Sequence, residues 1–112
     1  MKIDVRMNGN VCVIAPQGDI RLSEGDLQLR DTVQRQIEAG NARMVLDLGN
    51  VRFMDSAGIG EVVASLKRVR ESGGDLKMSG LNQRITDLFT LTKLITIFEV
   101  HPDENAAVKS FS

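Results

Sequence analysis

The chain has 112 residues, a single cysteine and a net charge of −1 from 14 basic and 15 acidic residues, which is the size and balance of one domain. It has no excess of positive charge to follow a nucleic acid, and only 4% of its residues are aromatic, so we expect no nucleic-acid partner. No apolar run approaches the roughly 18–20 residues of a membrane span, and the alternating start is not a signal peptide, so we expect a cytoplasmic domain that spans residues 1–112 and binds no membrane.

The first part of the chain predicts a β-hairpin followed by a helix. Apolar and polar residues alternate before Asn8-Gly9, and the apolar run after this pair contains Cys12, which we interpret as a small buried hydrophobe. Pro16 is expected to end the second strand, because proline has no N–H to donate to a ladder. A helix is expected from about Ser23, as its N-cap, to Glu38. Its apolar face would consist of Leu22, Leu29, Val33 and Ile37.

From residue 43 onward, strands and helices alternate. Strands are expected at 43–48, 75–79 and 95–100, and helices from near Ser56 to Gly73-Gly74, from Asn82 to Leu91, and from Pro102-Asp103 onward. Connections between parallel strands are right-handed and carry a helix. The order therefore predicts a single-domain α/β fold, with a mixed, mostly parallel β-sheet, an N-terminal hairpin and about four helices.

Several kinds of enzyme site lack their residues. A nucleophilic Ser56 would need a general base, and the only histidine, His101, is expected as a solvated residue at the start of the last helix. One cysteine and one histidine cannot form a structural zinc site, and we interpret Asp47 and Asp55 as a turn acid and a helix-entry acid. The glycines at 58 and 60 are not followed by the rest of a dinucleotide fingerprint. We therefore expect no enzyme, no catalytic residue, no metal and no cofactor.

The segment Asp55-Ser56-Ala57-Gly58-Ile59-Gly60 is the most informative one, because it follows a predicted buried strand and opens an amphipathic helix. Its serine has two interpretations. It is either a helix N-cap, worth about 1 kcal/mol, or an accessible acceptor for a phosphate at a helix N-terminus. The two glycines lower helix propensity by up to about 1 kcal/mol each, so they favour a contact surface where the backbone is open to another molecule.

A phosphate on Ser56 would add about −1.5 to −2 charges beside Asp55. A helix N-terminus tolerates such a charge, so the fold should survive. Two unit charges 4 Å apart repel by about 4 kcal/mol at an effective dielectric of 20, and even half of that exceeds a tenfold loss of affinity. The segment thus predicts an electrostatic switch that keeps the fold and releases a partner.

Together with residues 45–48, the segment from Phe53 to Gly60 resembles the signature of anti-sigma factor antagonists, the STAS domain family. The resemblance extends over nearly the whole chain, including the early hairpin followed by Gly18-Asp19, the Gly73-Gly74 pair and the short helix around 85–89. It implies a small bacterial cytoplasmic regulator that binds an anti-sigma factor, often itself a serine kinase, and so releases a sigma factor. The kinase, with its own ATP, would inactivate the regulator by phosphorylating Ser56, and a serine phosphatase would reverse this.

Two positions differ from the family pattern. Ala57 stands where many members have a second hydroxyl, and Arg21 follows Asp19-Ile20 where the family often has an acid. The resemblance and the small residues of the motif give the candidate partner-binding residues Asp19, Asp55, Ser56, Ala57, Gly58, Ile59 and Gly60. The alternative is a STAS scaffold subunit of a sensory or transport complex, which does not switch and in which Ser56 is only a cap.

Overall fold

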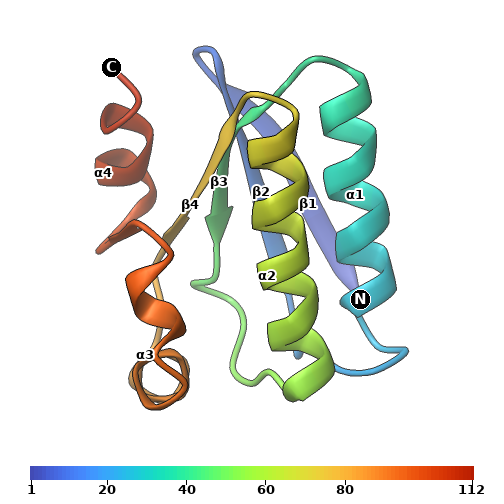
Figure 1. Ribbon diagram of the computed structural model, residues 1–112, viewed down its shortest axis with the longest axis vertical. Helices are drawn as coiled ribbons and strands as arrows, with labels where there is room; N and C mark the ends of the chain where they lie inside the picture. Colours follow the sequence, from blue (N-terminus) through green and yellow to red (C-terminus); the bar gives the residue numbers. More distant parts are fainter.

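The computed structural model describes residues 1–112 as one five-stranded sheet with helices on both faces. The strands are β1 (Lys2–Asn8), β2 (Val11–Gln17), β3 (Arg43–Asp47), β4 (Asp75–Ser79) and β5 (Val100–His101). The helices are α1 (Asp26–Glu38), α2 (Ser56–Glu71), α3 (Gln83–Leu91) and α4 (Glu104–Lys109), with a short 3₁₀ helix, η1 (Leu94–Thr96). The strands lie in the order β1-β2-β3-β4-β5; β1 and β2 are antiparallel and all other pairs are parallel (Figure 1). The expected fold class is confirmed.

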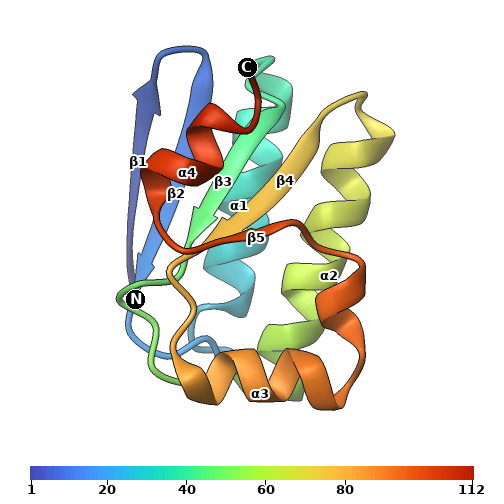
Figure 2. The same cartoon turned by 90° about the vertical axis from the view of Figure 1, so that its left-hand side faces the viewer.

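The core lies mainly between the sheet and the pair α1 and α2. Figure 2 shows α4 on the opposite face of the sheet and α3 across its lower end. Buried side chains of β2, β3, β4, α1, α2 and α3 form the main cluster, which includes Ile14, Leu46, Leu66 and Phe89. A smaller cluster under α4 contains Val11, Val13, Val45 and Ala107. Cys12 belongs to the main cluster and is fully buried, as expected.

The hairpin forms at the predicted place, with a two-residue loop between the paired residues Asn8 and Val11. Gly9 has φ +63°, which a tight hairpin turn requires and which glycine adopts without strain. The prediction that Pro16 ends the second strand is wrong, because β2 continues to Gln17. The pairing of β2 with β3 already stops at Ile14, so no N–H is needed from Pro16 on that side.

The first helix begins at Asp26, three residues later than predicted. Ser23 is not its N-cap; Ser23 lies in a turn at φ +60°, and the N-cap is Gly25 at φ +106°. Gln28 accepts a hydrogen bond from the Gly25 N–H through its Oε1 at 2.8 Å, which satisfies one of the free N–H groups at the helix start. Leu22 precedes the helix and is 69% exposed, so it does not share the apolar face. Leu29 and Val33 are buried on that face, as predicted.

The last strand is much shorter than the predicted range of 95–100. Only Val100 and His101 pair with β4, and the preceding residues form η1 after Lys93, which has φ +62°. Leu94 and Ile95 pack against the main core, and Phe98 packs on Phe89 with ring centroids 5.7 Å apart. The apolar side chains of this segment are therefore buried by a turn, which the alternation pattern of a strand does not reveal. The predicted starts of α2, α3 and α4 are confirmed to within a residue or two.

Candidate functional site

The motif from Asp55 to Gly60 lies where the loops after β2 and β3 run side by side, at the start of α2. The Ile20 N–H donates to the Phe53 carbonyl at 3.0 Å, and the Asp55 N–H donates to the Ile20 carbonyl at 3.3 Å. These bonds form a parallel bridge between Ile20 and Met54 beyond the ends of the strands. They hold the two loops together and present the first turn of α2 at the lower end of the molecule (Figure 1).

Asp55, and not Ser56, is the N-cap of α2. Its Oδ1 accepts the Gly58 N–H at 2.8 Å, and its Oδ2 accepts the Leu22 N–H at 3.0 Å. These backbone donors, Leu22 first and Gly58 second, lower the pKa of Asp55 because they stabilise the charged carboxylate. The N-cap interpretation of Ser56 is therefore wrong. The charged Asp55 carboxylate holds the β2–α1 loop against α2 and accepts a hydrogen bond from an N–H group of the first turn of the helix.

Ser56 is the first residue of α2, and its side chain is exposed. The hydrogen bonds at this helix start are made by Asp55, so the Ser56 hydroxyl takes no part in the cap. An oxyanion attached there would lie beside free N–H groups of the first turn and the positive end of the helix dipole. The site thus combines an accessible hydroxyl with a local environment that tolerates added negative charge.

The two glycines of the motif have different surroundings. Gly58 is buried, and a Cβ at this position would lie 2.1 Å from the Ile20 carbonyl oxygen. The interpretation that small residues leave the backbone open is therefore wrong for Gly58, whose missing side chain lets the β2–α1 loop approach the helix. Gly60 is exposed, and a Cβ there would meet nothing within 4 Å. Ile59 is half-buried and packs against the main core, so it offers only part of its side chain to a partner.

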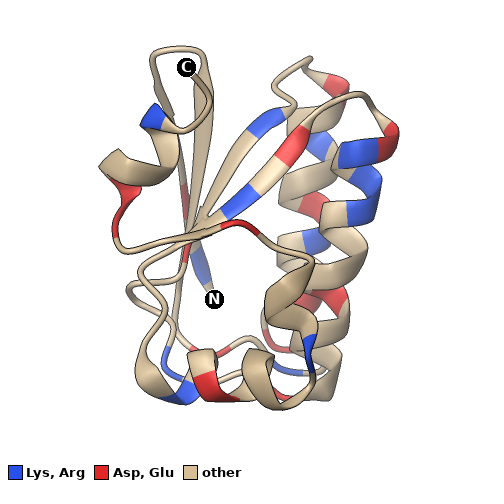
Figure 3. Ribbon diagram, turned by 60° about the vertical axis from the view of Figure 1, so that its left-hand side comes forward, with Lys and Arg blue, Asp and Glu red and all other residues tan.

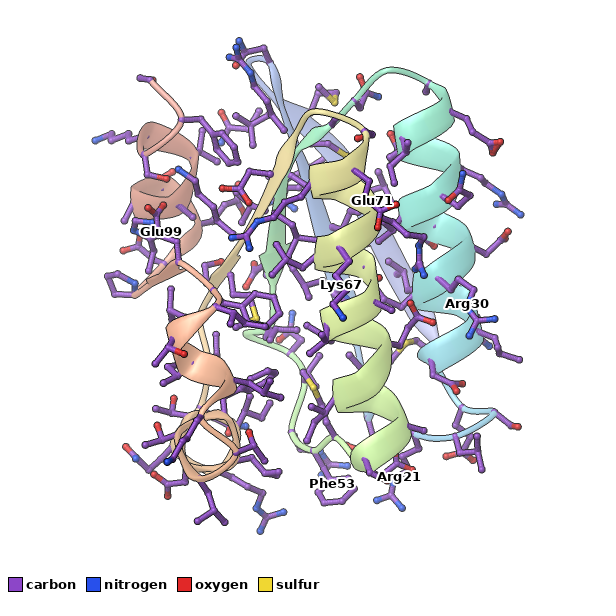
Figure 4. All side chains as sticks on the ribbon, viewed as in Figure 1. Arg21, Arg30, Phe53, Lys67, Glu71 and Glu99 are labelled. Atoms are coloured by element: carbon purple, nitrogen blue, oxygen red, sulfur yellow. The ribbon has the colours of Figure 1, made fainter.

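Asp19 lies in the same region, in the loop after β2. Its Oδ2 accepts a hydrogen bond from Arg21 Nη2 at 3.1 Å, whereas its Oδ1 is buried and has no hydrogen-bond partner. The Arg21 guanidinium stacks on the Phe53 ring, with its central carbon 4.7 Å from the ring centroid. Figure 4 shows Arg21 and Phe53 side by side below the first turn of α2. The structure thus brings Asp19 to the same end of the molecule as Ser56.

Three residues next to Asp19, Arg21 and Phe53 were not predicted from the sequence. Arg52, Asn82 and Arg84 line one depression of about 640 Å³ together with Asp19, Arg21 and Phe53. Asn82 anchors α3 there: its Oδ1 accepts the Ile85 N–H at 2.8 Å, and its Nδ2 donates to the Val51 carbonyl at 3.1 Å. Arg21 was the one sequence signal for this basic depression, because it stands where an acid is frequent.

The other titratable residues considered from the sequence lie outside this region. His101 is half-buried, with Nε2 2.8 Å from Glu99 Oε2, and Asp47 accepts the Gly49 N–H at 3.0 Å as a turn acid. Burial raises the pKa of the Cys12 thiol. No three or more His, Cys, Asp or Glu side chains gather where they could hold a metal ion. None of the helices has the length and apolar character needed to cross a bilayer.

Comparisons with known proteins agree with this architecture. The profile of the family described as STAS domain matches residues 2–107. The anti-sigma-B factor antagonist of Bacillus subtilis is 30% identical over 109 residues, which cover 97% of this chain and 98% of that protein. A crystal structure of an anti-sigma factor antagonist from Mycobacterium paratuberculosis superposes with a TM-score of 0.86 at 19% identity, covering 97% of this chain and 92% of that one. The Bacillus cell fate determinant SpoIIAA in its phosphorylated form superposes with a TM-score of 0.76 at 18% identity, covering 99% of this chain and all of that one.

The relatives identified in this way are regulators and not enzymes. Both the sequence match over almost the full length and the shared fold lead to one assignment. The chain belongs to the STAS domain family, within the group of anti-sigma factor antagonists.

Proposed function

We propose that this protein is an anti-sigma factor antagonist whose binding is switched by phosphorylation of Ser56. In the unphosphorylated form it sequesters an anti-sigma factor that is also a serine kinase, and so releases a sigma factor. The kinase phosphorylates Ser56, and a serine phosphatase restores the binding form. The observation that carries the proposal is the exposed Ser56 hydroxyl at the first position of α2, left free by the Asp55 cap.

Three further observations support it. Relatives that match almost the whole chain are anti-sigma factor antagonists. SpoIIAA, which has the same fold, is described in both an unphosphorylated and a phosphorylated form. The candidate partner-binding residues Asp19 and Asp55 lie on the two loops that the bridge between Ile20 and Met54 holds together, and Ser56, Ala57 and Gly60 follow at the start of α2.

Charge explains how the switch would act. A phosphate on Ser56 brings about −1.5 to −2 charges next to Asp55, whose lowered pKa keeps it ionised. A negative group of the partner 4 Å away is then repelled by about 4 kcal/mol at an effective dielectric of 20. The cap does not use the Ser56 hydroxyl, so the phosphate leaves the hydrogen bonds of Asp55 intact. The partner is released while the fold is preserved.

The test is phosphorylation with a candidate anti-sigma factor kinase and ATP, followed by mass spectrometry of the modified residue. Partner affinity is then compared for the wild type, the phosphorylated protein, and the variants Ser56→Asp and Ser56→Asn. We expect a loss of about tenfold or more for the charged forms, whereas the uncharged asparagine of similar size changes affinity much less. Ser112→Asp adds the same charge at the exposed C-terminus, at the opposite end of the molecule from the start of α2, and serves as the matched control.

Phosphate on another residue, or equal partner affinity for Ser56→Asp and Ser56→Asn, would refute the switch. A stable complex with sensory or transport subunits, unaffected by charge at Ser56, would instead favour the alternative of a scaffold subunit.

A further inference from the structure

The basic depression beside Ser56 is positively charged, whereas the chain as a whole carries a small net negative charge. Its lining has three guanidinium groups, from Arg21, Arg52 and Arg84, against the single carboxylate of Asp19. The whole chain has a net charge of −1, so positive charge is concentrated here locally. Figure 3 shows basic segments at the lower end of the molecule, around the start of α3 and the loop that precedes α2.

Two of these arginines have no acidic partner within the protein. Arg21 is paired with Asp19, but none of the ion pairs of the protein involves Arg52 or Arg84. Both side chains are exposed. Arginine binds carboxylates through two parallel N–H bonds, so two free guanidinium groups in one depression form a ready receptor for acidic side chains.

The walls of the depression are held in place by other contacts. The Phe53 ring supports the Arg21 guanidinium from below at 4.7 Å. Asn82 links α3 to the loop that carries Arg52, donating to the carbonyls of Val51 at 3.1 Å and Arg52 at 3.3 Å. A receptor whose walls are already ordered loses less conformational entropy on binding. The depression is thus suited to binding and is not merely a solvated group of charges.

A partner interface of ordinary size that is centred on Ser56 reaches this depression. Phe53 precedes Ser56 by three residues, so their Cα atoms are at most about 11 Å apart. An ordinary protein interface buries about 800 Å² on each side, which corresponds to a disc of about 16 Å radius. The Leu22 N–H bond to Asp55 at 3.0 Å also ties the loop of Arg21 to the start of α2.

The geometry points to this depression as the docking site for an acidic segment of the protein partner, a run of Asp and Glu side chains that pair with Arg52 and Arg84. The inference rests on the proposed function, whose partner it describes by its chemistry. A phosphate on Ser56 would then repel the carboxylates of that segment, so phosphorylation would weaken binding of the partner.

The test uses the full chain and a blocked hexaglutamate peptide as the probe, with ¹H–¹⁵N NMR titration at about 20 mM salt to limit screening. We expect chemical-shift changes to gather at Arg21, Arg52, Phe53 and Arg84. Other exposed cations without an ion pair act as internal controls and should change little: Arg43, Lys67, Lys93 and Lys109. Inorganic pyrophosphate is titrated in parallel.

Matched variants separate a specific site from general charge. The pair Arg52→Glu and Arg84→Glu should weaken the peptide complex about fivefold or more, whereas Arg43→Glu with Lys67→Glu, which changes net charge equally, should weaken it less than about twofold. The spectra themselves show whether each variant is folded. Equal losses for both pairs, or shifts spread over all cations, would overturn the proposal. Tighter binding of pyrophosphate at the same residues would also overturn it, in favour of a phosphate site.

Ser56 variants make the two proposals separable. Ser56→Ala should bind the peptide as the wild type does, and Ser56→Asp should bind it about threefold or more weakly through repulsion at short range. Peptide binding that is equal in all three proteins would show that the depression and Ser56 do not share a docking surface. A protein that binds the peptide as expected but is never phosphorylated would retain the acidic docking site and disprove only the switch.

Discussion

Replacing Gly58 by alanine tests whether the close approach of the β2–α1 loop to α2 holds the site together. The new Cβ would lie 2.1 Å from the Ile20 carbonyl oxygen and 2.9 Å from the Ile20 carbonyl carbon. These are backbone atoms, so the overlap cannot be relieved by rotating a side chain. The loop must move away from the helix, and the bridge between Ile20 and Met54 must weaken.

The size of the effect follows from three contributions. Alanine raises helix propensity over glycine by about 1 kcal/mol. Forcing an extra methyl group into a filled space costs about 1–3 kcal/mol. Weakening the two bonds that Ile20 makes, at 3.0 Å to Phe53 and 3.3 Å from Asp55, costs roughly 1 kcal/mol each. We therefore expect Gly58→Ala to lower the free energy of unfolding by about 2–4 kcal/mol.

Gly60→Ala is the matched control, because it lies two residues further along the same helix and its Cβ would meet nothing within 4 Å. It should raise the free energy of unfolding by up to about 1 kcal/mol through helix propensity alone. Urea unfolding followed by circular dichroism measures both variants. A change of the same sign and similar size in the two proteins would refute the reasoning, because it would show that Gly58 is determined by helix propensity and not by the contact with Ile20.

Three further outcomes are expected. Ser56→Ala should change the free energy of unfolding by less than about 0.5 kcal/mol in urea melts, since the cap does not use its hydroxyl; a loss of 1 kcal/mol or more, about the value of a cap, would reinstate it as the cap. Asp55→Ala should cost about 1–2 kcal/mol by the same measurement, because it removes the acceptor of the Gly58 N–H at 2.8 Å, and an unchanged protein would contradict the assigned cap. Hydrogen bonds from Lys77, with the largest effect, and from His101 lower the pKa of Glu99 from 4.5 to about 2. The contribution of Glu99 to the free energy of unfolding is therefore present above pH 4.5 and is lost as the pH falls toward 2. Glu99→Gln should flatten the dependence of stability on pH in that range.

Local sequence patterns were sufficient to predict the hairpin turn and the buried face of α2. The Asn8-Gly9 pair specifies a tight turn by its backbone preferences, and the regular spacing of Val62, Leu66 and Val69 specifies one buried helix face. The expected order of strands and helices follows from these signals, and with it the mixed sheet. The start of α1 was predicted wrongly because Ser23 and Gly25 are both suitable N-cap residues, and the local sequence does not distinguish between them.

The sequence by itself determined the fold class, the place of the motif at a helix entry and the exposure of Ser56, since periodicity and turn residues act within a few positions of the chain. Only the tertiary structure decided that the capping residue Asp55 also holds the β2–α1 loop, because its second carboxylate oxygen is bound by Leu22, 33 residues away. The same is true of Gly58, where no side chain fits because the carbonyl oxygen of Ile20 lies too close. The basic depression likewise exists only once two loops and the start of α3, which carry Arg21, Arg52 and Arg84, converge at one end of the sheet. Contacts between residues far apart in sequence depend on how the layers pack, and no local pattern encodes them.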